Sequence, residues 1–244
     1  IAGRYSSTIN DTITINTDSG GPTLSADPED SGGWKRGDTS VTLLVSDSSG
    51  VAEAKYRWDN SDAEGGGTSF NNNDIINSPC SDAHRLYLWA KDDLDNESTW
   101  ASEVDAYKCD YDDPEVDELK VDNVGVEGSP VTNTDGTPSI YFEVSDSGGA
   151  NLKQAEVWRK DGTCSSGAEW NQVSGNITVS GTSDSDTWNE PSIIDNGTYC
   201  YGVHVDDNCE PSRDSDETDS GQGPIEVVVS VDIPSCDSDD DCSD

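Results

Sequence analysis

The sequence contains little of what nucleic-acid binding, membrane insertion or zinc coordination requires. Among its 244 residues, 13 lysines and arginines stand against 51 aspartates and glutamates, a formal net charge of −38. Phosphate backbones and anionic lipid surfaces are bound through Lys and Arg, so neither is an expected partner. No apolar run approaches the roughly 20 residues of a membrane-spanning helix. Two histidines and no Cys-x-x-Cys pair also argue against zinc.

Catalytic signatures are missing as well. The sequence has no Gly-x-Ser-x-Gly, His-Glu-x-x-His, P-loop or dinucleotide-binding fingerprint. With 51 acidic residues, some carboxylates lie close together by chance, so their number does not indicate a glycosidase pair. We therefore expect no enzymatic activity.

Methionine is also absent, and the chain begins with isoleucine, so we expect a processed or excised segment. Seven cysteines without a metal or redox motif favour disulfides and an oxidising, extracellular compartment. Glycosylation sequons agree with that location, although such short patterns also arise by chance. They begin at Asn10, Asn96, Asn176 and Asn196.

One pattern occurs twice in the sequence. VSDSSG at 45–50 returns as VSDSGG at 144–149, a shift of 99 residues (144 − 45). Runs of alternating apolar and polar residues flank both copies, which predicts half-buried strands joined by a turn. In that turn, Ser and Asp side chains satisfy backbone groups. Further along, YLWAKDD at 87–93 matches YGVHVDD at 201–207, a shift of 114 (201 − 87). These repeats predict tandem domains.

Prolines that follow acidic turns mark the domain joints, at Pro22, Pro114 and Pro234. The larger second shift predicts an insertion, either a longer loop or an added hairpin. The expected parts are an N-terminal strand (1–21), a first domain (22–113), a second domain (114–233) with its insertion at about 161–195, and an acidic tail (234–244).

The N-terminal strand has three interpretations. Ile9, Ile13 and Ile15 share one face of residues 8–16. The strand can be the end of a preceding domain, or it can pack back on its own chain. It can also be a donor strand that completes a sheet in a neighbouring copy by strand exchange.

The first copy contains Trp-x-x-Gly-Asp-Thr at 34–39, a strand, Ser-Asp-Ser-x-Gly, and a late aromatic-x-x-Ala-x-Asp strand at 87–92. This order resembles the bacterial immunoglobulin-like repeats of prokaryotic surface proteins. The resemblance covers about 20–110 well and 114–233 loosely, because the second copy lacks the Trp-x-x-Gly-Asp stretch. It implies an all-β fold of two tandem immunoglobulin-like β-sandwiches, used outside the cell as spacer, stalk, adhesin or filament modules.

Sandwich topology then suggests cysteine partners. In a seven-stranded sandwich the last two strands, F and G, are antiparallel, so the start of F lies beside the end of G. This places Cys80 next to Cys109, and their disulfide would contribute roughly 3 kcal/mol in the chain-entropy model. In the second copy Cys164 follows strand C and Cys200 begins strand F, so these two form the second expected pair.

Three cysteines remain. Cys209 has no assigned partner. Cys236 and Cys242 lie in the acidic tail and pair either with each other or with cysteines of a module beyond residue 244. The odd total leaves one thiol free or intermolecular.

Calcium is the one cofactor that the sequence suggests. It binds six to eight oxygens from carboxylates, carbonyls and water. One candidate group precedes Pro114 and resembles the acidic linkers of cadherins, and the other ends the F-like strand. The alternatives are solvated acidic turns and adaptation to salt. The candidate ligands are Asp110, Asp112 and Asp113, and Asp92, Asp93 and Asp95.

These observations favour an extracellular structural protein, a subunit of a surface filament or stalk. Its partners would be copies of itself or adjacent domains of a longer surface protein. The alternative is an adhesin or carbohydrate-binding module in which Trp170 and Trp188 stack on glycans, unless both tryptophans cover a small core of the insertion. An accessory segment of a secreted hydrolase is a third hypothesis.

Overall fold

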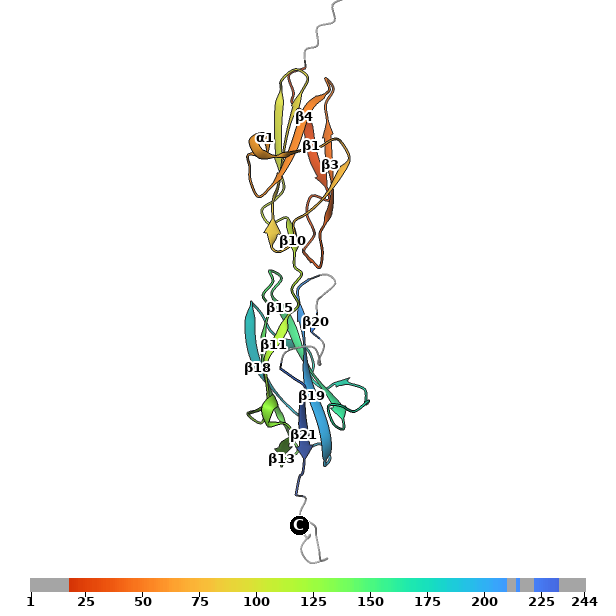
Figure 1. The fold of residues 1–244 in the computed structure, drawn as a ribbon, viewed down its shortest axis with the longest axis vertical. Helices are drawn as coiled ribbons and strands as arrows, with labels where there is room; N and C mark the ends of the chain where they lie inside the picture. The colour runs from red at the N-terminus through yellow and green to blue at the C-terminus, as the bar shows by residue number, and fades with distance from the viewer. Residues whose placement is uncertain (1–17, 210–213, 216–221, 233–244) are drawn as a thin grey trace, which may run out of the picture. The chain divides into compact units, whose positions relative to one another are not determined.

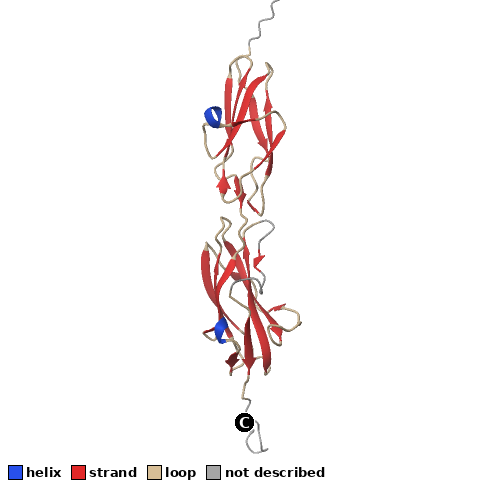
Figure 2. Ribbon diagram, in the orientation of Figure 1, coloured by secondary structure: helices blue, strands red, loops and turns tan. Residues whose placement is uncertain are grey.

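The computed structural model describes residues 18–209, 214–215 and 222–232, and within them nearly all regular structure is β-strand (Figures 1 and 2). The helical elements are one turn each, α1 (Ala63–Gly66) and the 3-10 helix η1 (Val126–Gly128). The chain forms two compact units. The first contains residues 18–29, 40–76 and 85–104, and the second contains 30–39, 77–84 and the described residues from 105 onward.

The first unit consists of two sheets with a core between them. One has the order β1–β3–β6 and the other the order β5–β4–β8–β9. Alternate residues of β3, Val41, Leu43 and Val45, are buried, as period-two patterning requires. Leu86 and Leu88 of β8 are buried as well. The strands are β1 (Thr23–Asp27), β3 (Ser40–Ser46), β4 (Val51–Trp58), β5 (Thr68–Ser69), β6 (Asp74–Asn77), β8 (Leu86–Asp92) and β9 (Glu97–Ala101).

A small three-stranded sheet contains the first disulfide. β2 (Trp34–Lys35) pairs in parallel with β10 (Tyr107–Cys109), and β7 (Ala83–His84) pairs antiparallel with β10. Cys80 is bonded to Cys109, with the two Cα atoms 4.7 Å apart. The structure therefore confirms this pairing.

The remainder of the second unit is a larger sandwich. Its sheets have the orders β12–β11–β14–β18 and β13–β21–β19–β15–β16, with β17 on β15 and β20 on β19. The strands are β11 (Glu115–Val121), β12 (Val124–Gly125), β13 (Val131–Asn133), β14 (Ser139–Ser145), β15 (Leu152–Asp161), β16 (Asn171–Gln172), β17 (Ile177–Thr178), β18 (Ser183–Asn189), β19 (Gly197–Asp207), β20 (Asp214–Ser215) and β21 (Ile225–Val229).

The core of this sandwich is built from both sheets. Phe142 of β14 and Val157 of β15 are fully buried, as is Tyr201 of β19. Cys164 is bonded to Cys200, with a Cα–Cα distance of 5.0 Å, as the sandwich topology predicted. The described chain is thus all-β, with immunoglobulin-like sandwiches as the resemblance implied.

One pairing joins an early strand of the larger sandwich to its last strand. β13 runs parallel to β21, with Val131 opposite Val227 and Asn133 opposite Val229. The bond from Ser230 N–H to the Asn133 carbonyl, 2.9 Å, continues the contact. An early strand and the last strand of this sandwich are therefore joined directly.

The segment 161–195, expected as an insertion, contains three short or edge strands. β16 and β17 both pair antiparallel with β15. β18 belongs to the sandwich itself, because it pairs along its whole length with β14.

Several predicted features lie outside the described residues, namely Ile9, Ile13, Ile15, Asn10, Cys236 and Cys242. Among the residues that are described, no helix has the length and apolar character needed to cross a membrane.

Candidate functional site

Three buried aspartates come together in the second unit. Asp110 follows β10, Asp146 follows β14 and Asp207 ends β19, and they are 2, 2 and 0 % exposed. We call them the second-unit aspartate cluster. Oxygens of Asp110 and Asp207 and the Sγ of Cys209 lie within 4.8 Å of one another. Three loops distant in sequence thus place carboxylates in one buried region.

Local turn geometry orients each of these carboxylates. One oxygen of each aspartate, Oδ1, accepts the backbone N–H two residues further along, which is the Asx-turn arrangement. The other oxygen of Asp110 accepts the Ala150 N–H at 2.7 Å. The other oxygen of Asp146, Oδ2, is buried and has no hydrogen-bond partner among the described residues. The Asx donors are Asp112 to Asp110, Gly148 to Asp146 and Cys209 to Asp207, each at 2.9 Å.

The cluster is strongly electronegative. Burial raises the pKa of Asp146, and the neighbouring charges of Asp110 and Asp207 raise it further. Burial likewise raises the pKa of the Cys209 thiol to about 12, together with the adjacent carboxylates, Asp207 first. These groups would therefore be stabilised by any positive charge placed among them.

Position 148 requires a glycine because the Asp110 carboxylate lies very close to its backbone. A Cβ atom at this position would lie 2.0 Å from both carboxylate oxygens of Asp110, closer than any real contact. The glycine in the second copy of the repeated turn therefore lets Asp110 reach the backbone beside Asp146.

The first unit contains a matching set, Asp18, Asp47 and Asp92, which we call the first-unit aspartate cluster. Asp18 precedes Pro22 by four residues (22 − 18), as Asp110 precedes Pro114 (114 − 110). Asp47 holds the place of Asp146 in the repeated turn, and Asp92 ends β8. Their Oδ1 atoms also accept the N–H two residues on, from Gly20 at 3.0 Å, Ser49 at 2.7 Å and Leu94 at 2.8 Å.

At one position of the repeated turn the two clusters carry different residues. In the first unit the Ser49 hydroxyl lies 2.7 Å from Asp47 Oδ1 and 3.0 Å from Asp92 Oδ2, bridging two carboxylates. Asn96 donates its amide to the same oxygen of Asp92 at 2.8 Å. Although burial acts to raise the pKa of Asp92, these bonds outweigh it and lower the pKa. The residue equivalent to Ser49 in the second unit is Gly148, which has no hydroxyl.

The strand ladders correct one alignment made from sequence. Matching the Asp-Asp pairs equates Asp93 with Asp207. In the structure, Val51 lies opposite Asp92 and Leu152 lies opposite Asp207, each followed by a register shift, so Asp92 is the counterpart. Because each copy has two adjacent aspartates, a sequence alignment can be wrong by one residue. The pairing between strands identifies the correct counterpart.

The structure separates most of the aspartates suggested as calcium ligands. Asp112 and Asp113 are exposed, whereas Asp110 is buried. Asp95 forms an ion pair with Lys91 at 3.1 Å and is well exposed, while Asp92 is buried among its hydrogen-bond donors. Asp146, Asp207 and Cys209 were not among the predicted ligands. The repeated turn contains Asp146 and the repeated Asp-Asp pair contains Asp207, so these two repeats could have identified both aspartates from the sequence.

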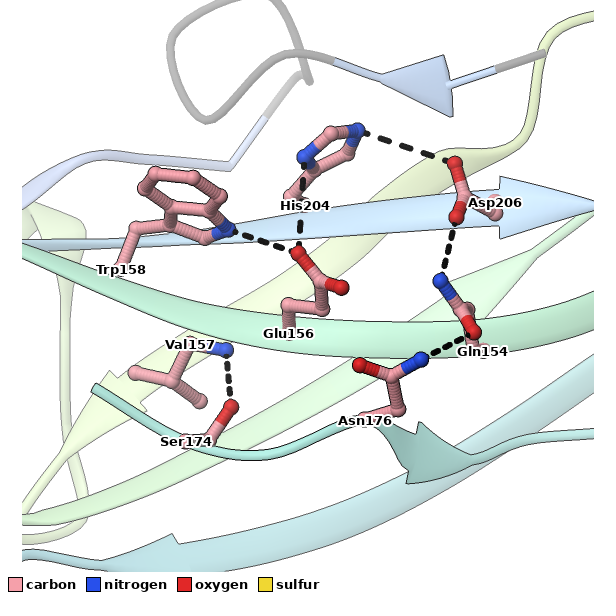
Figure 3. Close-up of polar contacts among 8 residues, drawn as sticks. All are labelled: Gln154, Glu156, Val157, Trp158, Ser174, Asn176, His204 and Asp206. Atoms are coloured by element: carbon pink, nitrogen blue, oxygen red, sulfur yellow. Dashed lines mark hydrogen bonds and ion pairs between the residues drawn. The ribbon is translucent and has the colours of Figure 1, made fainter. Parts of the chain in front are cut away.

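A second polar group lies on the face of β15 and β19 that points away from the core (Figure 3). We call Gln154, Glu156, Trp158, His204 and Asp206 the outer-face row. Glu156 accepts the Trp158 indole N–H at 3.1 Å and lies 4.0 Å from His204 Nδ1. His204 Nε2 lies 3.8 Å from Asp206, which accepts the Gln154 amide at 2.7 Å. The row is a set of hydrogen bonds and ion-pair contacts across two strands, beside one tryptophan.

The tryptophans of the predicted insertion have local partners. Trp188 is partly buried and packs against the second unit's core. The Nζ of Lys160 lies 4.8 Å from the centre of the Trp170 ring. Trp188 therefore covers the core of the sandwich rather than a core of the insertion, and Trp170 has a cationic partner.

The described sequon asparagines all make side-chain hydrogen bonds. Asn96 donates to Asp92 as described above. Asn176 donates to Gln154 at 2.6 Å, and Asn196 accepts from the Val231 N–H at 2.7 Å. Asn176 and Asn196 are exposed, whereas Asn96 is half-buried.

Comparisons with known proteins add little to this geometry. No protein-family model matches the chain, and no curated protein matches it. Fibronectin(III)-like modules of Clostridium thermocellum CbhA align over 86 % of this chain and 95 % of theirs, at 14 % identity and a TM-score of 0.35. A chain of a cytokine receptor complex aligns over 82 % and 98 %, at 11 % identity and a TM-score of 0.28. The fold assignment rests on the strands themselves.

Proposed function

We propose that this chain is a load-bearing module of an extracellular filament or stalk on a prokaryotic cell. The parallel pairing of β13 with β21 is the observation that carries the proposal. Tension on the two ends of the second unit pulls these strands along their length in opposite directions. Because they are parallel, their hydrogen bonds are loaded side by side and break together, whereas an antiparallel hairpin pulled at one end opens bond by bond.

The disulfides support the same role. The Cys164–Cys200 disulfide closes a loop with a sequence separation of 36 residues. Tension on the chain cannot extend this loop while the disulfide is intact. Disulfides persist in oxidising compartments, in agreement with an extracellular location. The excess of negative charge, −38 over the chain, favours solubility outside the cell and disfavours binding to nucleic acid.

Single-molecule force spectroscopy on the whole chain, held at its two ends, tests this function. Ser230→Pro removes the backbone N–H that donates to the Asn133 carbonyl of β13, and because Ser230 is exposed the core is not altered. We expect this variant to lower the unfolding force of the second unit. Gln172→Pro, on the exposed edge strand β16 inside the disulfide loop, is the matched control and should leave the force unchanged.

Reducing the disulfides adds a second measurement to the same experiment, the length of chain released when the second unit unfolds. Breaking Cys164–Cys200 should lengthen the release of the second unit by about 120 Å, from 36 residues at roughly 3.3–3.6 Å each. Equal unfolding forces for wild type and Ser230→Pro would contradict the load-bearing role.

Assembly through strand exchange is a separate part of the proposal. The last strands of the two described sandwiches, β9 and β21, each pair within their own sandwich. An added strand would therefore pair at a sheet edge. Light scattering should show large assemblies of the full chain that disappear when residues 1–16 are deleted. A uniform monomer would contradict self-assembly and leave a stalk segment joined to neighbouring domains.

A second candidate, adhesion to glycans, is favoured by the outer-face row. Sugar-binding surfaces combine an aromatic ring with hydrogen-bonding side chains, and Trp158 with Glu156, Asp206 and Gln154 provides both. A glycan array with wild type, Trp158→Ala and Trp170→Ala decides between the row and the predicted insertion. Binding unchanged in both variants, or absent in wild type, would contradict this candidate.

A further inference from the structure

The second-unit aspartate cluster poses an electrostatic problem. Burying carboxylates costs free energy unless hydrogen bonds or opposite charges compensate. Asp146 is 2 % exposed, and its Oδ2 atom has no hydrogen-bond partner among the described residues. Among the described residues, the charges of Asp110 and Asp207 act on Asp146, and both are negative. A buried oxygen of this kind requires an explanation, and a bound cation would both partner the oxygen and offset the repulsion.

The first unit shows what the second unit lacks. In the first-unit aspartate cluster the Ser49 hydroxyl bridges Asp47 and Asp92, and the Ser48 hydroxyl donates to Asp18. In the second unit, Gly148 replaces Ser49. The Asx turns that orient the carboxylates are nevertheless the same in both clusters. The second cluster therefore keeps the Asx turns of the three aspartates and lacks the hydroxyl that lies between two of the carboxylates.

We propose that Asp110, Asp146 and Asp207 bind one divalent cation of the calcium class, and that the Ser49 hydroxyl fills the equivalent place in the first unit. Three carboxylates form a hard, oxygen-rich ligand set, which suits Ca²⁺. The backbone carbonyl of Asp110, 4.0 Å from Cys209 Sγ, lies at the same cluster and offers a neutral oxygen. Water can complete the six to eight ligands that calcium takes. This inference rests on the cluster alone and is independent of the proposed function.

Calorimetric titration of the full chain, stripped with a chelator, tests the proposal. Titration with CaCl₂ at about 0.15 M potassium chloride limits diffuse attraction to the acidic surface, because exposed charges are screened beyond about 8 Å. We expect one saturable site per chain and a higher melting temperature when the site is filled. Parallel titrations with Mg²⁺ and Zn²⁺ test the class of cation.

Matched variants locate the site. Asp146→Asn keeps the shape of the side chain and removes its charge. It should weaken Ca²⁺ binding roughly a hundredfold, because the affinity of such sites follows the number of charged ligands. Asp47→Asn, the equivalent change in the first unit, is the control and should leave binding unchanged. If Asp146→Asn does not fold, Asp207→Asn answers the same question.

Terbium luminescence supplies a reading specific to this position. The Trp34 indole lies against Gly149, the residue after Gly148, so Trp34 can transfer excitation energy to Tb³⁺ bound at the cluster. Trp34→Phe should reduce the luminescence while leaving Ca²⁺ binding intact.

Three outcomes would overturn the proposal. They are the absence of saturable Ca²⁺ binding by wild type, equal affinities of wild type and Asp146→Asn, and tight binding of Zn²⁺ without Ca²⁺. None of them would affect the force measurements on β13 and β21, so failure of this inference is distinguishable from failure of the proposed function.

Discussion

Glu190 organises a buried polar contact in the second unit whose contribution to stability can be measured. It follows β18 and is 8 % exposed. Its Oε2 atom accepts Arg159 Nη1 at 2.7 Å and the Tyr201 hydroxyl at 3.0 Å. Arg159 comes from β15 and Tyr201 from β19, so one carboxylate oxygen holds two strands of the same sheet to the end of β18.

Glu190→Gln preserves the size of the side chain and removes its charge. Hydrogen bonds to charged groups contribute roughly 1.5–3 kcal/mol, and neutral ones about 0.5–1.5, so two weakened bonds cost about 2 kcal/mol. The Arg159 charge also loses its carboxylate, but its side chain is 23 % exposed and its guanidinium lies 5.3 Å from the Tyr199 ring centre. We therefore expect a total loss of about 2–3 kcal/mol, below the roughly 3–5 kcal/mol of a fully buried pair.

Urea unfolding of the whole chain, followed by hydrogen exchange of peptides from β15 and β19, reports on this unit specifically. With a slope of about 2 kcal/mol per molar urea, the midpoint should fall by roughly 1–1.5 M. Tyr201→Phe should cost about 1–2 kcal/mol in wild type and clearly less in the E190Q background, because the residues share one network. A change below about 0.5 kcal/mol for Glu190→Gln, the size of an ordinary surface substitution, would refute the reasoning.

Three further predictions concern cysteines and pH. Replacing Cys164 and Cys200 by alanine opens a loop of sequence separation 36 and should reduce stability by about 4 kcal/mol in the chain-entropy model, measured by urea unfolding; a loss below about 1 kcal/mol would contradict that account. Burial raises the pKa of Tyr201 above the value of about 10 that a tyrosine has in the unfolded chain. As pH rises, the unfolded state therefore loses the tyrosine proton first, and the free energy of unfolding should fall beyond about pH 10. The decline should be shallower in Tyr201→Phe, and identical pH profiles would disprove the assignment. Cys209 is 2 % exposed with a pKa of about 12, so at neutral pH iodoacetamide should alkylate it only after unfolding, as peptide mapping would show; rapid alkylation of the native protein would contradict its burial.

Much of the architecture could be predicted from local patterns. The alternation in residues 40–46 indicated β3, and Val41, Leu43 and Val45 are indeed the buried positions. The cysteine pairs followed from sandwich topology, because antiparallel strands fix which ends are neighbours. Both disulfides of the described chain were predicted in this way.

The candidate site was predictable only in part. Asp110 was identified from its position before Pro114, but Asp112 and Asp113 beside it are exposed. The sequence placed Asp146 in the repeated turn. Hydrogen bonding to the turn backbone was sufficient to explain an aspartate there, so nothing indicated a further role. Its contact with Asp110 and Asp207 depends on how three loops meet, and spacing along the chain carries no information about that distance.

By itself, the sequence determined the strand pattern, the repeated turn and the excess of negative charge, because periodicity, turn chemistry and composition act locally. The tertiary structure decided which aspartates share a buried region, since burial and carboxylate repulsion depend on distances between segments far apart in the chain. It also decided that the Ser49 hydroxyl, which Gly148 lacks, lies between two carboxylates in the first unit. That exchange of a hydroxyl for a hydrogen changes the environment of Asp146, and its consequence is visible only once the neighbouring strands are in place.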